Sequence, residues 1–418
     1  MHRIAVLGAG ITGVTTAYSL LEHDVDVTVL DRNRYAAMET SFANGGQLSA
    51  SNAEVWNQWS TVLKGIKWLF DKNAPLSLNL KPSLHKYGWL AEFLLNIPHY
   101  KSNTIATARL AIEAREHLLR MAQDAGISFD LEKRGILHIY QSRSGFDHAT
   151  RVNPLLACGG LARTAVTAAE MRSIEPTLHS DFYGGYYTES DFTGDIHKYT
   201  RGLADAARDR GVRFNWDTDV DQLKWHADGI TVTSSTNGEQ VTERFDAFVV
   251  CAGVGSRRLA SMLGDRVNIY PVKGYSITVP LGDAASQSSA PWVSLLDDDA
   301  KIVTSRLGQA RFRVAGTAEF NGFNRDIRAD RVKPLVDWTR NLFPEVDTSA
   351  CVPWAGLRPM NPNMMPKVGA GRRPGVYYNT GHGHLGWTLS GATAAMVAEQ
   401  MRGDRVVTAM PRPRLSFS

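Results

Sequence analysis

The first thirty residues alternate between short apolar runs and a helical pattern. Residues 3–8 (RIAVLG) form an apolar run of strand length, and residues 25–30 form a second one. Between them, over residues 12–23, apolar side chains recur at helical spacing. A strand, a helix and a strand in this order predict a right-handed crossover, so we expect the two strands to be parallel neighbours.

The middle of the chain shows a different pattern. Residues 51–130 are mainly helical, and Gly126 is a good stop for the clearest of these helices. The following segments have the pattern of an antiparallel sheet: 267–280, 301–304 and 311–316.

Two later segments return to the pattern of a parallel sheet. Residues 245–250 are a continuous apolar run that leads into a glycine turn, which indicates a strand buried on both faces. Near the end, residues 375–381 (GVYYNTG) predict a strand, and a helix follows over 389–401. The parallel pattern therefore lies at both ends and in the middle of the chain, and we expect domains that are discontinuous in sequence.

A glycine pattern follows the first strand directly. Gly8, Gly10 and Gly13 form G-x-G-x-x-G, in which the first glycine permits the tight turn, the second lets a pyrophosphate approach the backbone, and the third lets helix and strand pack closely. The start of the helix offers N–H groups and the positive end of its dipole. Asp31 ends the second strand, where a carboxylate accepts hydrogen bonds from a ribose hydroxyl. These features predict a dinucleotide site.

The fingerprint alone does not separate NAD from FAD. Asp31 argues against a 2′-phosphate and hence against NADP. The position at the extreme N-terminus favours FAD. The other candidate, residues 253–256 (GVGS), lacks the third glycine, so we do not expect a second nicotinamide site.

Composition excludes several classes of protein. Of the 418 residues 43% are hydrophobic and 21% charged, which is typical of a globular protein, and the net charge of +4 is dispersed along the chain. Such a charge does not indicate nucleic acid as a partner and gives only weak attraction to an anionic membrane. No apolar run reaches the ~18 residues of a membrane span, and no N-terminal signal is visible, so we expect a cytoplasmic protein.

The three cysteines carry no metal or disulfide pattern. Cys158, Cys251 and Cys351 are far apart and have no paired spacing, so we expect no metal and interpret them as buried side chains in a reducing compartment.

Six further segments match one protein family. The chain resembles the D-amino acid dehydrogenase small-subunit family, within the D-amino acid oxidase and glycine oxidase superfamily, and it keeps the order of that family's motifs over almost its whole length. The matching segments are ETSFANGGQLS (39–49), TGDIHKYT (193–200), PVKGYSIT (271–278), VAGTAEF (314–320), WAGLRPM (354–360) and NTGHGHLGWT (379–388).

The resemblance implies an α/β fold with an FAD-binding Rossmann-type domain and a discontinuous α+β substrate domain built on an antiparallel sheet. We expect the FAD-binding domain to comprise residues 1–50, 160–265 and 352–418, and the substrate domain to comprise 51–159 and 266–351.

The resemblance also implies which residues bind FAD. Residues 383–387 place backbone N–H groups beside the flavin N1–C2=O edge, residues 47–49 lie close to the flavin ring, and residues 217–220 reach the adenine. Because residues 39–47 contain no histidine or cysteine for an 8α link, we expect non-covalent FAD. The expected cofactor-binding residues are Gly8, Gly10, Ile11, Thr12, Gly13, Asp31, Arg32, Ser41, Gln47, Leu48, Val220, Cys251, Ala252, Gly253, Gly383, His384, Leu385, Gly386, Trp387 and Thr388.

Three residues are expected to act on the substrate. By resemblance, Arg358 in the Gly-Leu-Arg-Pro motif anchors the substrate carboxylate, and a guanidinium suits this task because its planar fork of donors stays charged. Lys273 and Tyr275 have the spacing of one face of a strand along the substrate cavity, although core packing explains them equally well. We interpret His382 and His384 as packing residues rather than catalytic bases.

The implied reaction is oxidative deamination of a D-amino acid. A hydride leaves Cα for flavin N5, the neutral amine becomes an imine, and the imino acid hydrolyses to a keto acid and ammonia. The electrons pass to a quinone or another respiratory acceptor, which is compatible with peripheral association on the inner face of a bacterial inner membrane. The D stereochemistry comes from the family resemblance alone.

Several alternatives stay open. The runner-up is an FAD-dependent oxidase or dehydrogenase of a secondary or N-methyl amino acid, of the sarcosine, glycine or proline type. Others are a flavin-binding module without a free amino acid substrate and an NAD-dependent dehydrogenase. One departure from the family bears on the substrate, because residues 360–366 replace a small polar turn and bring in Met364 and Met365. We expect these methionines to make the cavity mouth more apolar and adaptable.

Overall fold

Six strands form a mainly parallel sheet with the N-terminal strand near its centre. The computed structural model describes residues 2–68 and 75–406. All neighbouring strands of this sheet are parallel except the pair at one edge. Their order is β19 (Lys367–Ala370), β20 (Val376–Thr380), β13 (Ala247–Val250), β1 (His2–Leu7), β2 (Val25–Leu30) and β9 (Arg213–Asn215). The pairing of β1 with β2 confirms the crossover predicted at the N-terminus.

Both faces of this sheet are covered. Ile4 and Val6 of β1 pack into one core and Ala5 and Leu7 into another, because successive side chains of a strand point to opposite faces. Burial on both faces explains why the strands read as continuous apolar runs. The covering elements are α1 (Ile11–Leu20), α4 (Tyr100–Asp124), α7 (Ile196–Asp209) and α11 (Gly386–Gly403) on one face, and β10 (Thr218–His226), β11 (Gly229–Thr236), β12 (Glu239–Phe245) and α8 (Ser256–Met262) on the other.

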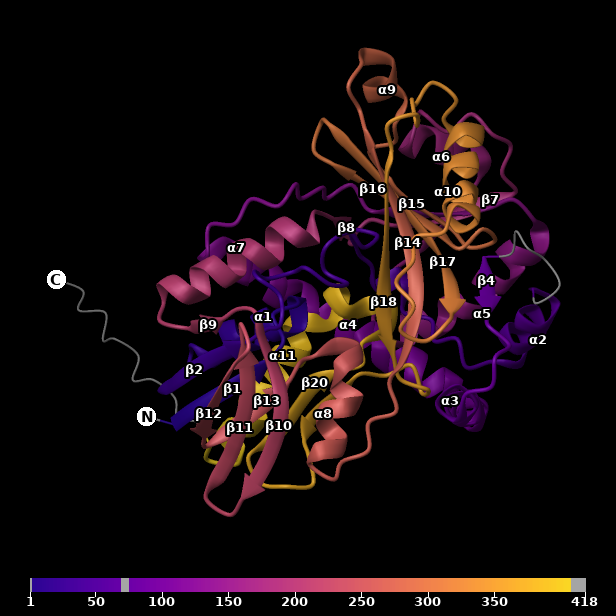
Figure 1. Cartoon of the computed structure of the whole chain (residues 1–418). Helices are drawn as coiled ribbons and strands as arrows, with labels where there is room; N and C mark the ends of the chain where they lie inside the picture. The colour runs from indigo at the N-terminus through magenta and orange to yellow at the C-terminus, as the bar shows by residue number, and fades with distance from the viewer. Residues whose placement is uncertain (1, 69–74, 407–418) are drawn as a thin grey trace.

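A second, largely antiparallel sheet has nine strands. In Figure 1 it stands beside the six-stranded sheet, with α10 (Ala329–Leu342) against it. Its pairs are antiparallel except β15 with β5 and β17 with β4. The strand order is β18 (Val352–Met360), β14 (Tyr270–Pro280), β17 (Arg311–Phe320), β16 (Ile302–Leu307), β15 (Ser294–Asp297), β5 (Ile136–Tyr140), β7 (Gly184–Thr188) and β6 (Thr164–Val166), and β4 (Leu76–Leu78) pairs with β17.

The remaining elements are short or lie outside the two large sheets. They are the strand pair β3 (Gln47–Leu48) with β8 (Phe192–Thr193), the α-helices α2 (Trp59–Trp68), α3 (Leu84–Leu95), α5 (Arg143–Cys158), α6 (Ala168–Ile174) and α9 (Ala284–Ser289), and the 3-10 helices η1 (Ala50–Asn52), η2 (Ile97–His99), η3 (Gly253–Gly255) and η4 (Gly383–Leu385).

The expected domain boundaries at 160 and 352 do not follow the sheets. β6 and β7 lie after residue 160, and β18 lies after residue 352, yet all three strands pair within the nine-stranded sheet. In addition α4, from the expected substrate domain, places Leu118 and Met121 in the core of the six-stranded sheet. The physical reason is that a strand's pattern shows which face is buried but not which distant strand it pairs with. Strand pairing therefore places β6, β7 and β18 in the nine-stranded sheet.

The cysteine expectation also needs one correction. Cys251 is buried and Cys351 is half-buried, but Cys158 is exposed. Cys158 is the last residue of α5, and the buried face of that helix carries Ala149, Val152 and Leu156 instead.

Candidate active site

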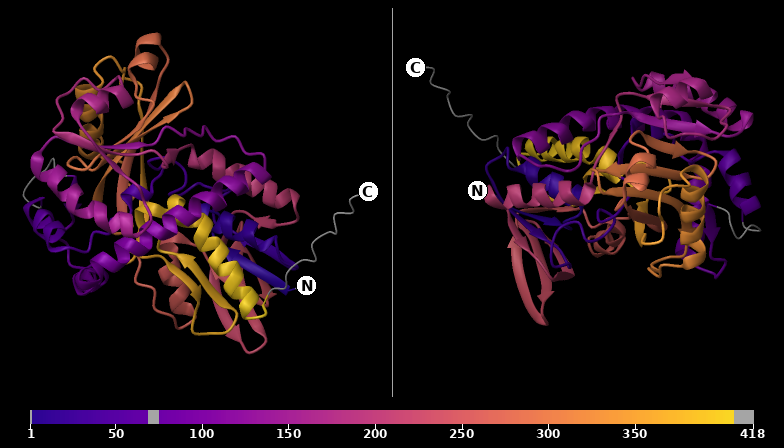
Figure 2. Two further views of the ribbon diagram at one scale, coloured as in Figure 1. Left: turned by 180° about the vertical axis from the view of Figure 1, so that it is seen from behind. Right: turned by 90° about the horizontal axis from the view of Figure 1, so that it is seen from above.

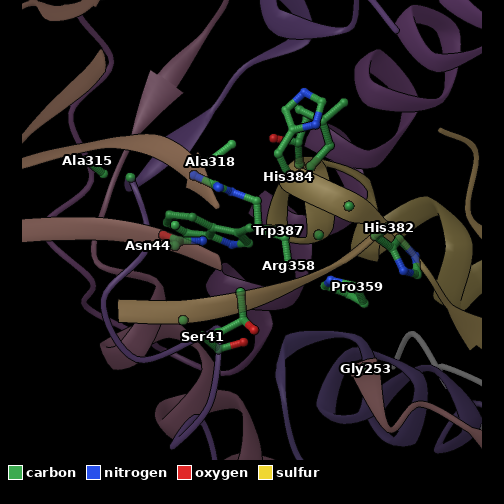
Figure 3. A pocket seen from close by; sticks show the side chains of 18 of the residues that line it. Ser41, Asn44, Gly253, Ala315, Ala318, Arg358, Pro359, His382, His384 and Trp387 are labelled. Carbon is green, nitrogen blue, oxygen red and sulfur yellow. The ribbon is translucent and has the colours of Figure 1, made fainter. Parts of the chain in front are cut away.

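A cavity of about 640 Å³ joins the two sheets. It begins at the carboxyl ends of the parallel strands, where Gly8 follows β1, Asp31 follows β2 and Cys251 follows β13. From there it extends to Arg358 on β18, and Figure 3 shows the labelled side chains at that end. The carboxyl edge of an open parallel sheet is where this class of fold binds its ligands.

The three glycines of the fingerprint have three different environments. Gly8 has φ +107°, a conformation that side chains rarely adopt, and its N–H donates to Leu30 O at 2.8 Å. A Cβ on Gly10 would meet only Ser41 Oγ, at 3.6 Å, so this residue leaves an open cradle in the cavity wall. A Cβ on Gly13 would lie 1.8 Å from Gly8 O. Gly13 is thus a packing residue and does not line the cavity.

Asp31 organises the same turn. Its Oδ2 accepts from the Ala9 N–H at 2.6 Å, and its Oδ1 accepts from the backbone N–H of Asn33 at 2.7 Å. Burial raises the pKa of the Asp31 carboxyl. Arg32, which also lines the cavity, is held by Glu39 at 2.5 Å. Asp31, Arg32 and Val220 of β10 therefore line this end of the cavity.

The start of α11 forms another part of the wall. Gly383 has φ +61°, and α11 begins at Gly386 without a capping side chain. The positive end of its dipole therefore faces the cavity. Trp387 lines the cavity, and its buried Nε1 has no hydrogen-bond partner within residues 2–68 and 75–406. All six expected residues from 383 to 388 line the cavity.

Residues 47–49 divide between cavity and core. The Gln47 amide lines the cavity and donates to Ser294 Oγ at 2.8 Å. Ser49 is tied to α11, because its N–H donates to Thr388 Oγ1 at 3.3 Å. Leu48, however, is buried in the core of the six-stranded sheet and does not line the cavity.

Arg358 has no counter-ion among the described residues. Its Nη1 donates to the Thr317 carbonyl at 2.9 Å, and burial alone lowers the pKa of the guanidinium to about 10. A Cβ on Gly274 would approach the guanidinium to 2.4 Å, so that glycine is needed for Arg358 to lie across β14. Figure 3 shows Arg358, His384 and Trp387 around the same part of the pocket. The site therefore holds a positive charge that a bound anion can neutralise.

Tyr275 and Lys273 both contact the carboxylate of Glu319. The Tyr275 hydroxyl donates to Glu319 Oε2 at 2.6 Å, and Lys273 Nζ lies 3.2 Å from the same oxygen. Burial first, and then Glu319, raise the pKa of Tyr275. Tyr275 lines the cavity, but Lys273 is fully buried, donates to Asn324 and is not a lining residue. The expectation that Lys273 presents its charge to the substrate is therefore corrected: Glu319 neutralises it in the core.

The two histidines near the site are neutral. His384 stacks on Trp56 with ring centroids 5.0 Å apart, and burial, with Arg358 nearby, lowers its pKa to about 4. His382 Nε2 lies 3.0 Å from Thr393 Oγ1, and burial lowers its pKa to about 3.

The methionines that depart from the family motif lie outside the cavity wall. Met364 is buried with Trp89 and Phe93, and Met365 Sδ accepts from Thr107 Oγ1 at 3.2 Å. The expectation that they line the cavity mouth is wrong, because neither residue is part of the cavity wall.

The cavity wall also carries charged residues that the sequence did not reveal. Glu54 accepts from Tyr100 Oη at 2.7 Å and lies 3.0 Å from His148 Nε2. Asp298 accepts from Tyr140 Oη at 2.7 Å and pairs with Lys301 at 3.3 Å. The one available signal was the acidic run at 297–299, which a solvated loop explains as well.

The observed wall fits a flavin dinucleotide. The open cradle at Gly10, the carboxylate of Asp31 and the uncapped start of α11 suit a diphosphate, a ribose and an electron-rich ring edge. The buried, unpartnered Trp387 Nε1 is a further donor at this wall.

Comparisons with known proteins agree with this description. The family model of the FAD dependent oxidoreductases matches residues 3–400. The chain is 63% identical over 409 residues to D-amino acid dehydrogenase 3 of Mesorhizobium japonicum, covering 98% of this chain and 99% of the relative. It is 40% identical to D-amino acid dehydrogenase of Paramagnetospirillum magneticum, covering 96% of this chain and 95% of the relative.

Solved structures show the same fold. The structure of glycine oxidase from Geobacillus kaustophilus is similar with a TM-score of 0.73 and 20% identity, covering 100% of this chain and 98% of that one. The L-proline dehydrogenase from P. horikoshii gives a TM-score of 0.72 at 17% identity, covering 98% of this chain and 95% of that one. The sequence matches and the shared fold lead to one conclusion: the chain belongs to the family of FAD dependent oxidoreductases.

Proposed function

We propose that this protein catalyses the FAD-dependent oxidative deamination of a D-amino acid. The observation that carries the proposal is that Arg358, without a counter-ion among the described residues, lies in the same cavity as the glycine turn after β1. The names of the relatives that are 63% and 40% identical support a D-amino acid as substrate. The product is an imino acid, which water hydrolyses to a keto acid and ammonia.

Arg358 binds the substrate carboxylate in this proposal. A guanidinium presents paired N–H donors that match the two oxygens of a carboxylate, and the partial burial of Arg358 strengthens that interaction. The Thr317 carbonyl and the close approach to Gly274 restrict the side chain's rotation. The carboxylate is then fixed in position, and Cα with it.

The other walls position and select the substrate. The positive charge of Arg358 favours a substrate amine in the neutral form that deamination requires, because a nearby like charge disfavours an ammonium, and neutral His384 adds no further charge. Tyr275, fixed by Glu319, presents a rigid aromatic surface to the cavity. Positioning by these residues lowers the entropic cost of the reaction.

The cofactor would be held by the residues around the first glycine turn and the start of α11. Bound FAD supplies the redox chemistry by accepting the hydride from the substrate. Gly10 and Ile11 would give backbone access to the diphosphate, Asp31 would accept from the ribose, and the dipole of α11 would stabilise negative charge on the ring. Non-covalent attachment remains a prediction, and denaturing the protein in acid should release all of its flavin.

The electron acceptor and the cellular location are further parts of the proposal. We expect electrons to leave to a quinone or another respiratory acceptor, with the protein attached peripherally to the inner face of a bacterial inner membrane. Across residues 2–68 and 75–406, none of the helices has the length and apolarity to cross a bilayer.

The test is anaerobic reduction of the bound flavin. The purified yellow protein is mixed, without oxygen, with D-, L- and N-methyl amino acids, and the loss of visible flavin absorption is followed. We expect rapid bleaching with one or more D-amino acids and formation of the keto acid and ammonia. Bleaching by an N-methyl or L-amino acid alone would overturn the proposed substrate, and a protein that takes up no FAD would overturn the proposal as a whole.

A further inference from the structure

Glu54 is a carboxylate in the cavity wall whose partners do not include a lysine or an arginine. Its Oε1 accepts hydrogen bonds from Tyr100 Oη and from Gln58 Nε2, both at 2.7 Å, and lies 3.0 Å from His148 Nε2. Among the described residues, no lysine or arginine forms a salt bridge with this carboxylate. Its other oxygen, Oε2, has one polar contact in that part of the chain, with His148 at 3.3 Å, so it can accept further hydrogen bonds.

Glu54 carries its negative charge at neutral pH. Burial acts to raise the pKa of this carboxyl, but the hydrogen bonds from His148 and Tyr100 outweigh burial and lower the pKa. An imidazole can donate from Nε2 in its neutral form, so the contact with His148 does not require a second charge. The side chain of Glu54 is only 24% exposed, and a charge so far removed from water favours the binding of a cation.

The segment that carries Glu54 contacts the imidazole beside Arg358. Asn52 O lies 3.4 Å from His384 Nε2, and the ring of Trp56 stacks on His384. Figure 3 shows His384 and Arg358 around the same part of the pocket. Glu54 stands between Asn52 and Trp56 in the chain and lines the same cavity as Arg358. The guanidinium and the carboxylate therefore border one continuous space.

The surroundings of Glu54 are held by three packed helices. Its neighbour Ala53 packs in one core with side chains of α4, α5 and α11. Helix α4 packs against both α5 and α11, and Figure 2 shows this side of the molecule in two further views. Tyr100 begins α4 and His148 belongs to α5, so both contacts of the carboxylate come from this helical framework. The negative charge is therefore held at a fixed place in the wall.

Other charged side chains near Glu54 are paired or exposed. Lys301 pairs with Asp298 at 3.3 Å, so these two charges offset each other. The remaining ones are exposed, and water and salt screen their charges. They are Lys64, Arg151 and Asp299. Glu54 is thus a sheltered anion without a lysine or arginine partner among the described residues, and Arg358 is a sheltered cation without a carboxylate partner.

We propose that the substrate is a D-amino acid with a cationic side chain, whose carboxylate binds Arg358 and whose side-chain ammonium or guanidinium binds Glu54. This inference rests on the proposed function and names its substrate class. The aliphatic part of such a side chain can lie along the uncharged rings of Trp56 and His384. The amine beside Glu54 keeps its proton, because an opposite charge favours the charged form, whereas the α-amine is oxidised in its neutral form.

Two pairs of substrates of matched shape test the proposal. D-Lysine is compared with D-norleucine, which has the same carbon chain without the terminal amine, and D-arginine with the uncharged D-citrulline. The flavin-loaded enzyme is assayed with a soluble dye as electron acceptor. We expect kcat/KM to be about tenfold higher or more for the cationic member of each pair, as for one hydrogen bond between charged groups.

The variant Glu54→Gln should remove this preference. Its kcat/KM should fall about tenfold more for D-lysine than for D-norleucine, so that the ratio of the two approaches one. A purely structural role of Glu54 would lower both values alike and leave the ratio at the wild-type value. The matched control is Glu189→Gln, which changes an exposed glutamate outside the cavity wall and should keep the wild-type ratio.

The outcomes separate this inference from the proposed function. Equal kcat/KM for D-lysine and D-norleucine in the wild type, or an unchanged ratio in Glu54→Gln, would overturn the inference, while turnover of D-norleucine would still support D-amino acid oxidation. A preference for D-glutamate over D-glutamine would also overturn it and assign the side-chain contact to Arg151. Failure of every D-amino acid to bleach the flavin would overturn the proposed function and this inference with it.

Discussion

At and near the cavity wall, the role of a charged side chain depends on whether a residue of opposite charge contacts it. Arg358 and Lys273 are both cations near the same strand pair, β14 and β18. Glu319 neutralises Lys273, whereas no carboxylate of the described residues reaches Arg358. For this reason we propose Arg358 as the anion-binding group, whereas Lys273 is part of the core.

Replacing Arg358 should separate substrate binding from cofactor binding. We expect Arg358→Gln to raise KM for the D-amino acid about 100-fold, because losing a partly buried charged partner costs about 3 kcal/mol. Arg358→Lys should raise KM less, since lysine restores the positive charge but lacks the paired N–H donors of a guanidinium. Steady-state kinetics measure the change, and the flavin content should stay at the wild-type value. An unchanged KM in the Gln variant would remove Arg358 from the site.

The buried histidines should make stability depend on pH. His382 is neutral in the folded protein with a pKa of about 3, but it titrates near 6.5 when unfolded. Below about pH 6.5 the unfolded chain therefore binds a proton that the folded chain does not. Stability should fall with decreasing pH by up to about 1.4 kcal/mol per pH unit for this residue.

Urea denaturation at pH 7, 6 and 5 measures that slope. His382→Gln, which keeps a hydrogen-bonding group near Thr393, should show a smaller slope than wild type. The surface variant His179→Gln serves as control because it leaves the buried imidazoles in place. Equal slopes for His382→Gln and wild type would contradict the assignment of a neutral, buried His382.

At the scale of elements, the turn between β1 and α1 combines two separate requirements. Gly13 brings the helix close to the strand, and Gly10 keeps the turn open toward the cavity. The two glycines should therefore respond differently to the same substitution.

Gly10→Ala should fold and lose FAD, whereas Gly13→Ala should lose stability. Gly10 has φ −73°, which alanine adopts readily, and its Cβ would make ordinary contact with Ser41. At Gly13 a Cβ would overlap Gly8 O, so overpacking should cost about 3 kcal/mol or more. Thermal melting of the flavin-free proteins and FAD titration separate the two effects. Equal melting temperatures for the two variants would refute the packing role of Gly13.

Elements formed by local pattern could be predicted from the sequence, but their distant partners could not. The strand at 25–30 coincides with β2, and Gly8, Gly10, Ile11 and Thr12 line the cavity. The pairing of β7 and β18 within the nine-stranded sheet was not visible in the sequence, because strand pairing joins residues far apart in the chain. Glu54 and Asp298 were missed for the same reason: each is an ordinary acid until the fold brings it to the cavity wall.

At the scale of the whole molecule, the cavity is where the two sheets meet. Its wall includes Gly8 and Cys251 from the ends of the parallel strands and Tyr275 and Arg358 from the nine-stranded sheet. A ligand that fills the cavity therefore contacts both halves of the molecule.

FAD should stabilise both sheets together. A ligand that binds only the folded state at 100 times its Kd adds about 2.7 kcal/mol of stability. We expect FAD to slow hydrogen exchange in β1 and β13 and also in β14 and β18. Hydrogen exchange with and without FAD measures this, and protection confined to the six-stranded sheet would show that the cofactor does not couple the halves.

The order of strands in the parallel sheet has a consequence for how the protein is made. β1 leaves the ribosome before its neighbour β13, and β20 and α11 follow later still. The glycine turn is therefore translated early and must wait for the last segment before its surroundings are complete. Flavin loading should accordingly follow translation, and a stalled nascent chain lacking α11 should remain colourless however much FAD the cell supplies.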